Sequence, residues 1–243
     1  MIFPSDDNGD DALALDPEFA ERFSDQPRPA CQLYLISPLD MGGDFPQRLA
    51  EALDAGAVAA FQFRAKGLDQ HVAARLAAPL VDICRARDVA FIVNDDMALA
   101  KRLDADGVHL GQGDGDPVEA RRLLGPDAQI GVTCHNSRHL AMSAGEAGAD
   151  YVAFGAFFDT ATKETEHRAE PALLSWWTTV SDIACVAIGG INAENCAPVV
   201  GAGADFIAVS SAVWSASDGP AAAVQRLLAA MVAPAAARRH SRG

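Results

Sequence analysis

The sequence lacks any uninterrupted apolar run of the roughly 20 residues that a membrane-spanning helix needs. Its first residues, MIFPSDDNGDDALALD, turn acidic at once and contain no basic leader followed by an apolar stretch. We therefore expect no membrane segment and a cytoplasmic location.

Basic residues are scarce, because 19 Lys and Arg stand against 33 Asp and Glu and give a net charge of −14. Binding to a nucleic-acid backbone needs clustered Lys and Arg, so this balance argues against a nucleic-acid partner. A small anionic substrate remains compatible with it. Such a substrate would need a local group of cations, or a divalent metal as counter-ion.

Cysteines are few and odd in number, and none are in a CxxC spacing. They lie mostly in apolar stretches, which argues against a zinc site or a disulfide framework. Free thiols, mostly buried, are the better interpretation. The five are Cys31, Cys84, Cys134, Cys185 and Cys196.

What the sequence has is apolar material, which makes up 50% of its 243 residues and suffices for one sizeable core. We predict a single catalytic domain over residues 30–234. An acidic arm over residues 1–29 precedes it, and a short basic tail over residues 235–243 follows it.

Apolar β-favouring runs alternate with Ala- and Leu-rich amphipathic stretches along this domain. The predicted strands are 31–37, 58–64, 89–94, 107–111, 129–134, 150–155, 183–189 and 205–210. Related junctions, DADGVHLG, AGADYVAFG and AGADFIAVS, lead into three of them, and each offers Gly or Asp for a left-handed helix end. Eight units of about 25 residues favour a (β/α)8 TIM barrel. An open doubly wound sheet should show GxGxxG after its first strand, and LYLISPLDMGGD does not.

Cations are expected at the carboxyl ends of the strands, where such barrels carry their active sites. In FQFR, successive side chains of a strand point to opposite faces, so Gln62 and Arg64 point into the barrel if the two phenylalanines pack outward under helices. An inward Arg is costly unless it faces an anion. With Lys66 and Lys163, it would form a cationic mouth suited to a diphosphate. The alternative is that Arg64 pairs with a carboxylate of the next strand, Asp95 or Asp96.

Carboxylates follow the third and fourth predicted strands. Asp95 and Asp114 would come from adjacent strands, and an oxygen-rich site without a zinc-like Cys or His cluster suits Mg²⁺. Asp114 could instead be a turn residue, and Asp96 could be the N-cap of the helix that starts at MALAKRL.

The last two strands end in IGGIN and VSSAVW, which predict a second phosphate site. Paired glycines let backbone N–H groups approach an oxyanion, and Ser210 and Ser211 would add hydroxyls. The alternative is a simple glycine turn with an N-cap serine. His135, after the fifth strand, is either an acid or base or an orienting hydrogen-bond donor.

At these residues the sequence resembles the thiamine-phosphate synthase family. The matching pieces are FQFRAK, FIVNDD, ADGVHLGQGD, IGVTCH, GADYVAFGAFF with TATK, VAIGGI and GADFIAVSSAV. Any one is weak, but together and in this order they are specific. The resemblance implies a transferase that couples hydroxymethylpyrimidine diphosphate to thiazole phosphate, giving thiamine phosphate and diphosphate with the help of Mg²⁺.

The resemblance also implies roles for individual residues. Arg64, Lys66 and Lys163 would be catalytic and would hold the diphosphate together with Thr133. The implied substrate-binding residues are Gln62, Phe63, Arg64, Ala65, Lys66, Asn94, Thr133, Thr160, Ala161, Thr162, Lys163, Gly190, Ser210 and Ser211. Within this set, Gln62 and Asn94 would contact the pyrimidine. The thiazole phosphate would be bound by Thr160, Thr162, Gly190, Ser210 and Ser211. Asp95 and Asp114 would ligate Mg²⁺.

Some positions depart from the family pattern. Ala65 stands where Glu is usual, Thr133 stands where Ser is common, and Asp159 and Ala161 replace the usual Pro and Glu. These changes bear on rate more than on the kind of reaction.

Two other functions stay open at this point. A thiazole tautomerase of the same superfamily would use His135 for proton transfer and would need no metal or diphosphate clamp. A non-catalytic barrel could bind thiamine phosphates without turnover. In each case the partners are small phosphorylated molecules, and a homo-oligomer is compatible with the sequence.

Overall fold

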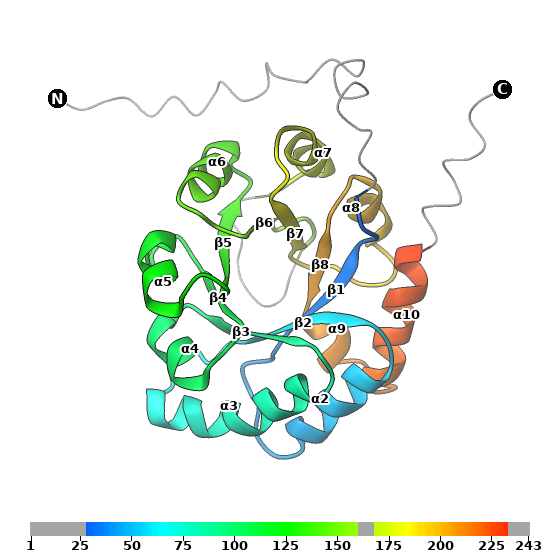
Figure 1. Cartoon of the computed structure of the whole chain (residues 1–243). Coiled ribbons are helices and arrows are strands. Elements are labelled where there is room, and N and C mark those ends of the chain that lie inside the picture. The colour runs from blue at the N-terminus through cyan, green and yellow to red at the C-terminus, as the bar shows by residue number, and fades with distance from the viewer. Residues whose placement is uncertain (1–27, 160–167, 233–243) are drawn as a thin grey trace.

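Eight parallel strands pair in chain order, and the last pairs with the first to close a barrel (Figure 1). The computed structural model describes residues 28–159 and 168–232. The strands are β1 (Gln32–Ile36), β2 (Val58–Phe63), β3 (Ala90–Asn94), β4 (Gly107–Leu110), β5 (Gln129–His135), β6 (Tyr151–Gly155), β7 (Ala184–Ile188) and β8 (Phe206–Val209). Each predicted strand differs from the observed one by at most one residue at either end. The predicted (β/α)8 barrel is therefore confirmed.

Helices surround the barrel on its outside (Figure 1). They are α2 (Phe45–Asp54), α3 (Gln70–Arg85), α4 (Met97–Leu103), α5 (Pro117–Leu124), α6 (Arg138–Glu146), α7 (Pro171–Val180), α8 (Ala197–Gly201), α9 (Ser211–Trp214) and α10 (Pro220–Val232). Side-chain caps start several of them, as where the Asp69 carboxylate accepts the N–H groups of His71 and Val72. In the described ranges, no helix is long and apolar enough to cross a membrane.

The side chains of each strand alternate between two buried layers, one between the strands and the helices and one inside the barrel. On β2, the side chains of Phe61 and Phe63 pack in the layer between strands and helices, where Phe63 stacks on Phe91 with ring centroids 5.9 Å apart. Ala60 and Gln62 alternate with them and face the barrel interior, as predicted. The interior is filled mainly by Tyr34, Ile36, Ala60, Ile92, Tyr151, Ala153, Val186 and Ala208.

The three related junctions prove to be clamps on the preceding strand. The backbone N–H of Asp150 donates to the carbonyl of Ile130 at 2.8 Å, and its carboxylate accepts the N–H of the same residue at 2.7 Å. Asp106 clamps Phe91, and Asp205 clamps Cys185, in the same way. The left-handed helix ends that were predicted are also present, at Asp104, Gly148 and Gly203. Each junction therefore ends a helix and sets the register of two strands.

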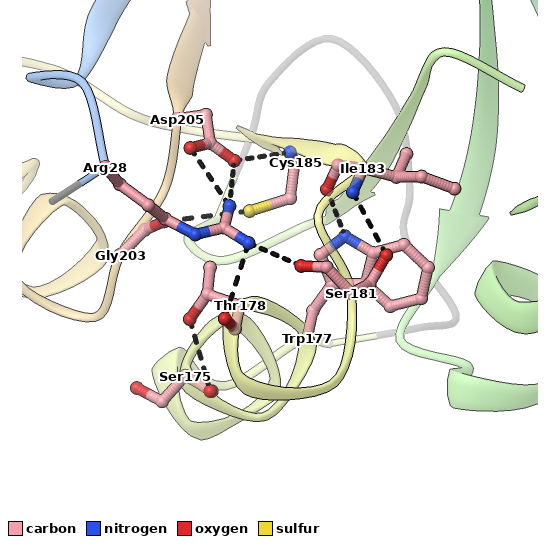
Figure 2. A network of polar contacts seen from close by, with 9 residues as sticks. All are labelled: Arg28, Ser175, Trp177, Thr178, Ser181, Ile183, Cys185, Gly203 and Asp205. Atoms are coloured by element: carbon pink, nitrogen blue, oxygen red, sulfur yellow. Dashed lines mark hydrogen bonds and ion pairs between the residues drawn. The ribbon is translucent and has the colours of Figure 1, made fainter. Parts of the chain in front are cut away.

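Arg28 connects the segment before β1 to the end of α7 and to the start of β8, the strand that closes the barrel against β1 (Figure 2). Its guanidinium contacts both carboxylate oxygens of Asp205, at 3.1 and 2.9 Å. It also donates to the backbone carbonyls of Thr178 and Ser181, at the end of α7. This cluster joins β1, α7 and β8 at the amino-terminal end of the barrel, away from the strand ends that carry the predicted site.

All five cysteines are free thiols, as predicted, and all but Cys31 are buried. Burial raises the pKa of Cys84, Cys134 and Cys185 to about 12, which keeps these thiols protonated.

Candidate active site

The predicted site residues that the structure describes lie at the carboxyl ends of the strands. Their order around the barrel follows the chain. Gln62 is in β2, and Arg64 and Lys66 follow that strand; Asn94 ends β3, and Asp95 follows it. Asp114 follows β4, Thr133 is in β5, and Gly190, Ser210 and Ser211 follow β7 and β8. Thr160, Ala161, Thr162 and Lys163 lie outside the described residues. Strand closure thus brings together residues that are far apart in the sequence.

Lys66 and Asp95 form an ion pair across the neighbouring strands β2 and β3. The Lys66 ammonium lies 3.5 Å from a carboxylate oxygen of Asp95, and the Lys66 side chain is about half exposed. Asp95 adopts a left-handed backbone with φ of 67°, and its N–H donates to the carbonyl of His109. Among the described residues, no carboxylate is within ion-pair distance of the Arg64 guanidinium. The alternative of an Arg64 pair is therefore wrong there, since Lys66 is the cation that contacts Asp95.

Asp95 and Asp114 lie close enough to influence each other. Burial raises the pKa of the Asp95 carboxyl, and the charge of Asp114 raises it further, while Lys66 opposes both effects. A side chain at position 111 would meet an Asp114 oxygen at 2.4 Å, so Gly111 leaves room for this carboxylate. Two carboxylates that repel each other in this way fit a divalent cation, which relieves their repulsion.

The same region contains no larger ligand set. The described part of the chain has no group of three or more His, Cys, Asp or Glu side chains placed to hold a metal ion. A hard cation such as Mg²⁺ commonly takes one or two protein carboxylates and completes its shell with water and substrate phosphate. The residues present fit that pattern.

Asp96 has a structural role. One of its oxygens accepts the N–H of Leu99 at 2.8 Å, and the other accepts the side-chain amide of Gln70 at 2.9 Å. It is the N-cap of α4, the alternative that the sequence left open.

Inside the barrel, a chain of hydrogen bonds leads from β2 to β5. The Gln62 amide donates to the Tyr34 hydroxyl at 3.1 Å, which lies 3.0 Å from the Tyr151 hydroxyl. Nδ1 of His109 lies 3.1 Å from that hydroxyl, and its Nε2 lies 2.8 Å from Oγ1 of Thr133. The two predicted substrate-binding residues at its ends are thus connected through buried side chains.

Burial fixes the protonation of this chain. It lowers the pKa of His109 to about 4, raises that of Tyr34 to about 12 and raises that of Tyr151 well above its usual value. The imidazole is therefore neutral and both phenols are protonated at neutral pH. Sequence reasoning named neither tyrosine, although both occupy inward positions of apolar strands, which is a signal that alternation could have given.

Ser37 is another residue that sequence reasoning missed. Only 1% of it is exposed, and it follows β1 directly. Its hydroxyl accepts the backbone N–H of Arg64 at 2.9 Å, and its carbonyl accepts the Ser210 hydroxyl at 3.4 Å. Ser37 thus joins the ends of β2 and β8. The signal was a hydroxyl at the end of the first strand.

Gly190 brings the loops after β7 and β6 together. Its φ is 66°, and a Cβ at this position would lie 2.3 Å from the carbonyl oxygen of Asp159. Only glycine fits there without a shift of backbone. The residues that continue from Asp159 are those expected to bind the thiazole phosphate, so the closeness of Asp159 to Gly190 agrees with a shared site.

Three other predicted residues are placed as follows. The Phe63 side chain is fully buried on the helix side of β2, which leaves only its backbone for a substrate contact, and the partly buried Ala65 packs against the same layer. His135 ends β5 with a left-handed backbone of φ 52° and is half-buried.

Known proteins are similar to this chain over most of its length. A family profile described as "Thiamine monophosphate synthase" matches residues 33–213. The chain is 69% identical over 191 residues to the thiamine-phosphate synthase of Erythrobacter litoralis, covering 77% of this chain and 90% of the relative. It is 54% identical over 195 residues to that of Rhodospirillum centenum, covering 80% and 94%. Among solved structures, it resembles a thiamine phosphate pyrophosphorylase from Pyrococcus furiosus, with a TM-score of 0.73, 32% identity and coverage of 82% and 95%.

Proposed function

Because the chain belongs to the thiamine monophosphate synthase family, we propose that it couples hydroxymethylpyrimidine diphosphate to thiazole phosphate. It is a transferase, and the products are thiamine phosphate and diphosphate. The observation that best supports this function is the meeting of Lys66, Asp95 and Asp114 at one end of the barrel. We assign this activity to a catalytic domain spanning residues 30–234.

The main requirement of the reaction is stabilisation of the negative charge on the leaving diphosphate. When the C–O bond of the pyrimidine diphosphate breaks, its electron pair departs with the diphosphate, and the thiazole nitrogen then attacks the carbon. Positive groups that contact the departing oxygens stabilise the charge that develops on them. Arg64, Lys66, Thr133 and Lys163 would have this role. Gln62 and Asn94 would orient the pyrimidine, whose amino group stabilises the cation.

Asp95 and Asp114 would hold Mg²⁺, whose chemistry when bound is to neutralise part of the diphosphate charge. Burial is the larger cause of the raised pKa of Asp95, and the second cause, the charge of Asp114, supports this assignment because it brings the two carboxylates near each other. Asp95 also keeps Lys66 beside the same place.

The thiazole phosphate would bind on the opposite side of the mouth, at the ends of β7 and β8. Gly190, Ser210 and Ser211 would contact it together with Thr160, Ala161 and Thr162. The close approach of Gly190 to the Asp159 carbonyl supports one shared site for these segments.

The function is tested by incubating the purified chain with both phosphorylated substrates and Mg²⁺ and measuring thiamine phosphate and diphosphate. We expect equal amounts of both products, and no reaction with EDTA in excess. Binding without product would contradict the proposal and favour a sensor. Isomerisation of the thiazole with EDTA present would favour a tautomerase.

Lys66→Ala and Asp95→Ala should each lower the coupling rate by about 100-fold or more, because each removes stabilisation of the leaving group. Lys101→Ala and Asp104→Ala are matched controls, since both residues lie at the C-terminal end of α4, away from the mouth. Wild-type rates in Lys66→Ala and Asp95→Ala would refute these assignments.

A further inference from the structure

The hydrogen-bonded chain inside the barrel takes one side chain from each of five strands. Gln62, Tyr34, Tyr151 and His109 are at most 7% exposed, and Thr133 lies at the open end. The two tyrosines are the only ones in the sequence. Such a chain has a direction, because each hydroxyl has a single proton to donate.

The amide of Gln62 sets this direction. When its Nε2–H donates to the Tyr34 oxygen, the Tyr34 proton must go to Tyr151, its other partner. The Tyr151 proton then goes to Nδ1 of His109. The neutral imidazole carries its own proton on Nε2 and donates it to Thr133, whose hydroxyl proton is left free to point out of the chain.

The opposite direction would leave Thr133 unsuited to an anion. If the Gln62 amide were turned over, every proton in the chain would reverse and Thr133 would donate to Nε2 of His109. It would then present only lone pairs to a substrate. A hydroxyl that faces a diphosphate must donate, because the diphosphate oxygens are acceptors.

We infer that His109 is a positioning residue that, through Tyr151, Tyr34 and Gln62, holds the Thr133 hydroxyl as a hydrogen-bond donor to the leaving diphosphate. This inference rests on the proposed function. It also links two parts of one substrate. A pyrimidine amino group that donates to the Gln62 carbonyl oxygen keeps the Gln62 Nε2–H groups turned to Tyr34, and so favours the donating state of Thr133.

The packing around the hydrogen-bonded side chains holds Tyr151 and His109 in place. The rings of His109 and Tyr151 stack with centroids 5.6 Å apart. A Cβ at position 131 would lie 2.0 Å from the Tyr151 ring, so the absence of a side chain at Gly131 makes room for Tyr151. Gly131 is two residues before Thr133 on β5, and both therefore face the interior.

The first test measures the imidazole directly in the full-length chain by ¹⁵N NMR at neutral pH, with the His109 signals identified by their loss in His109→Gln. We expect the proton on Nε2 and none on Nδ1. A proton on Nδ1 would overturn the inference. This outcome does not depend on turnover, so it separates a failure of the inference from a failure of the proposed function.

The second test removes one hydroxyl from the hydrogen-bonded chain and keeps the aromatic ring that carries it. Tyr151→Phe should weaken the binding of inorganic diphosphate about tenfold, because a donor to an anion is no longer oriented. It should lower kcat by a similar factor and leave KM for thiazole phosphate unchanged. Thr179→Val is the matched control, since it removes a hydroxyl that bonds only within α7.

A third comparison separates positioning from packing. His109→Gln retains an amide N–H near the position of Nε2, whereas His109→Leu keeps bulk alone. We expect His109→Gln to bind diphosphate at least several-fold more tightly than His109→Leu. Equal diphosphate affinity in wild type, Tyr151→Phe and His109→Leu, with the proteins folded, would overturn the inference.

Discussion

The buried imidazole of His109 makes stability depend on pH. Its pKa is about 4 in the folded chain because burial disfavours the charged form, against about 6.5 for an unfolded histidine. Between these two values the unfolded chain binds more protons than the folded one. The free energy of unfolding therefore falls as the pH is lowered from about 6.5 towards 4.

We expect this group alone to cost about 2 kcal/mol of stability between pH 7 and pH 5. Urea unfolding of the wild type and of His109→Asn at both pH values measures it, since the variant should lose that part of the pH dependence. His139→Asn, at an exposed position, is the control. An equal loss of stability in wild type and His109→Asn would disprove the assignment.

Gly131 provides a second prediction at the level of one residue. Gly131→Ala places a methyl group against the Tyr151 ring and should destabilise the protein by about 1–3 kcal/mol, as overpacking of a core does. Coupling activity should fall as well, because the ring is displaced from His109. Gly201→Ala is the control in α8, because a Cβ there would have no atom within 4 Å apart from its chain neighbours and the backbone of its own helix; it should leave thermal stability and activity nearly unchanged.

At the level of elements, the aspartate junctions explain why the strands could be predicted so closely. Three of the apolar runs begin just after Gly or Asp terminates a helix, and the Asp side chain of each junction clamps the preceding strand. The alternation of β2 likewise placed Gln62 correctly inside the barrel.

Contacts between elements could not be predicted in the same way. Asp95 contacts Lys66 and not Arg64. This choice depends on how far each side chain extends at the end of the barrel, which the alternation of inward and outward residues does not specify. The link from Tyr34 to Tyr151 joins strands whose contact requires the closed barrel, and their hydroxyls were concealed in runs that read as purely apolar.

The clamps themselves can be measured. Asp150→Ala removes the partner of the Ile130 N–H and the ion pair to Arg121, and should lower the free energy of unfolding by about 1–3 kcal/mol. Asp106→Ala should cost less, because this residue is more exposed. Urea unfolding compares the two with Asp127→Ala, a change at an exposed position. Losses in both Asp150→Ala and Asp106→Ala no larger than that in Asp127→Ala would show that the clamps do not govern strand stability.

At the scale of the whole molecule, the two ends of the barrel have separate tasks. Polar groups at the carboxyl ends of the strands are proposed to carry the chemistry, while the Arg28 cluster at the other end holds the seam together (Figure 2). This division is compatible with a net charge of −14, since Arg64 and Lys66, two cations proposed to bind the diphosphate, follow the same strand at one end of the barrel.

Arg28→Ala and Lys66→Ala should therefore have opposite profiles. The first should lower the unfolding free energy by about 1–3 kcal/mol, because it leaves Asp205 and two carbonyls without their partner, yet keep the wild-type kcat. The second should lower kcat with little change in stability, since its ion pair is largely exposed. Paired thermal melts and rate measurements decide this, and a loss of kcat in folded Arg28→Ala would contradict the separation.

The ion pair between Arg28 and Asp205 joins residues 177 positions apart. During synthesis, β1 leaves the ribosome before the other strands, and its second neighbour, β8, leaves after them, so the ring stays open until β8 has emerged. An unpaired parallel edge is a surface to which strands of other nascent chains can add. The last step of barrel formation is therefore also the step that protects the newborn chain from aggregation.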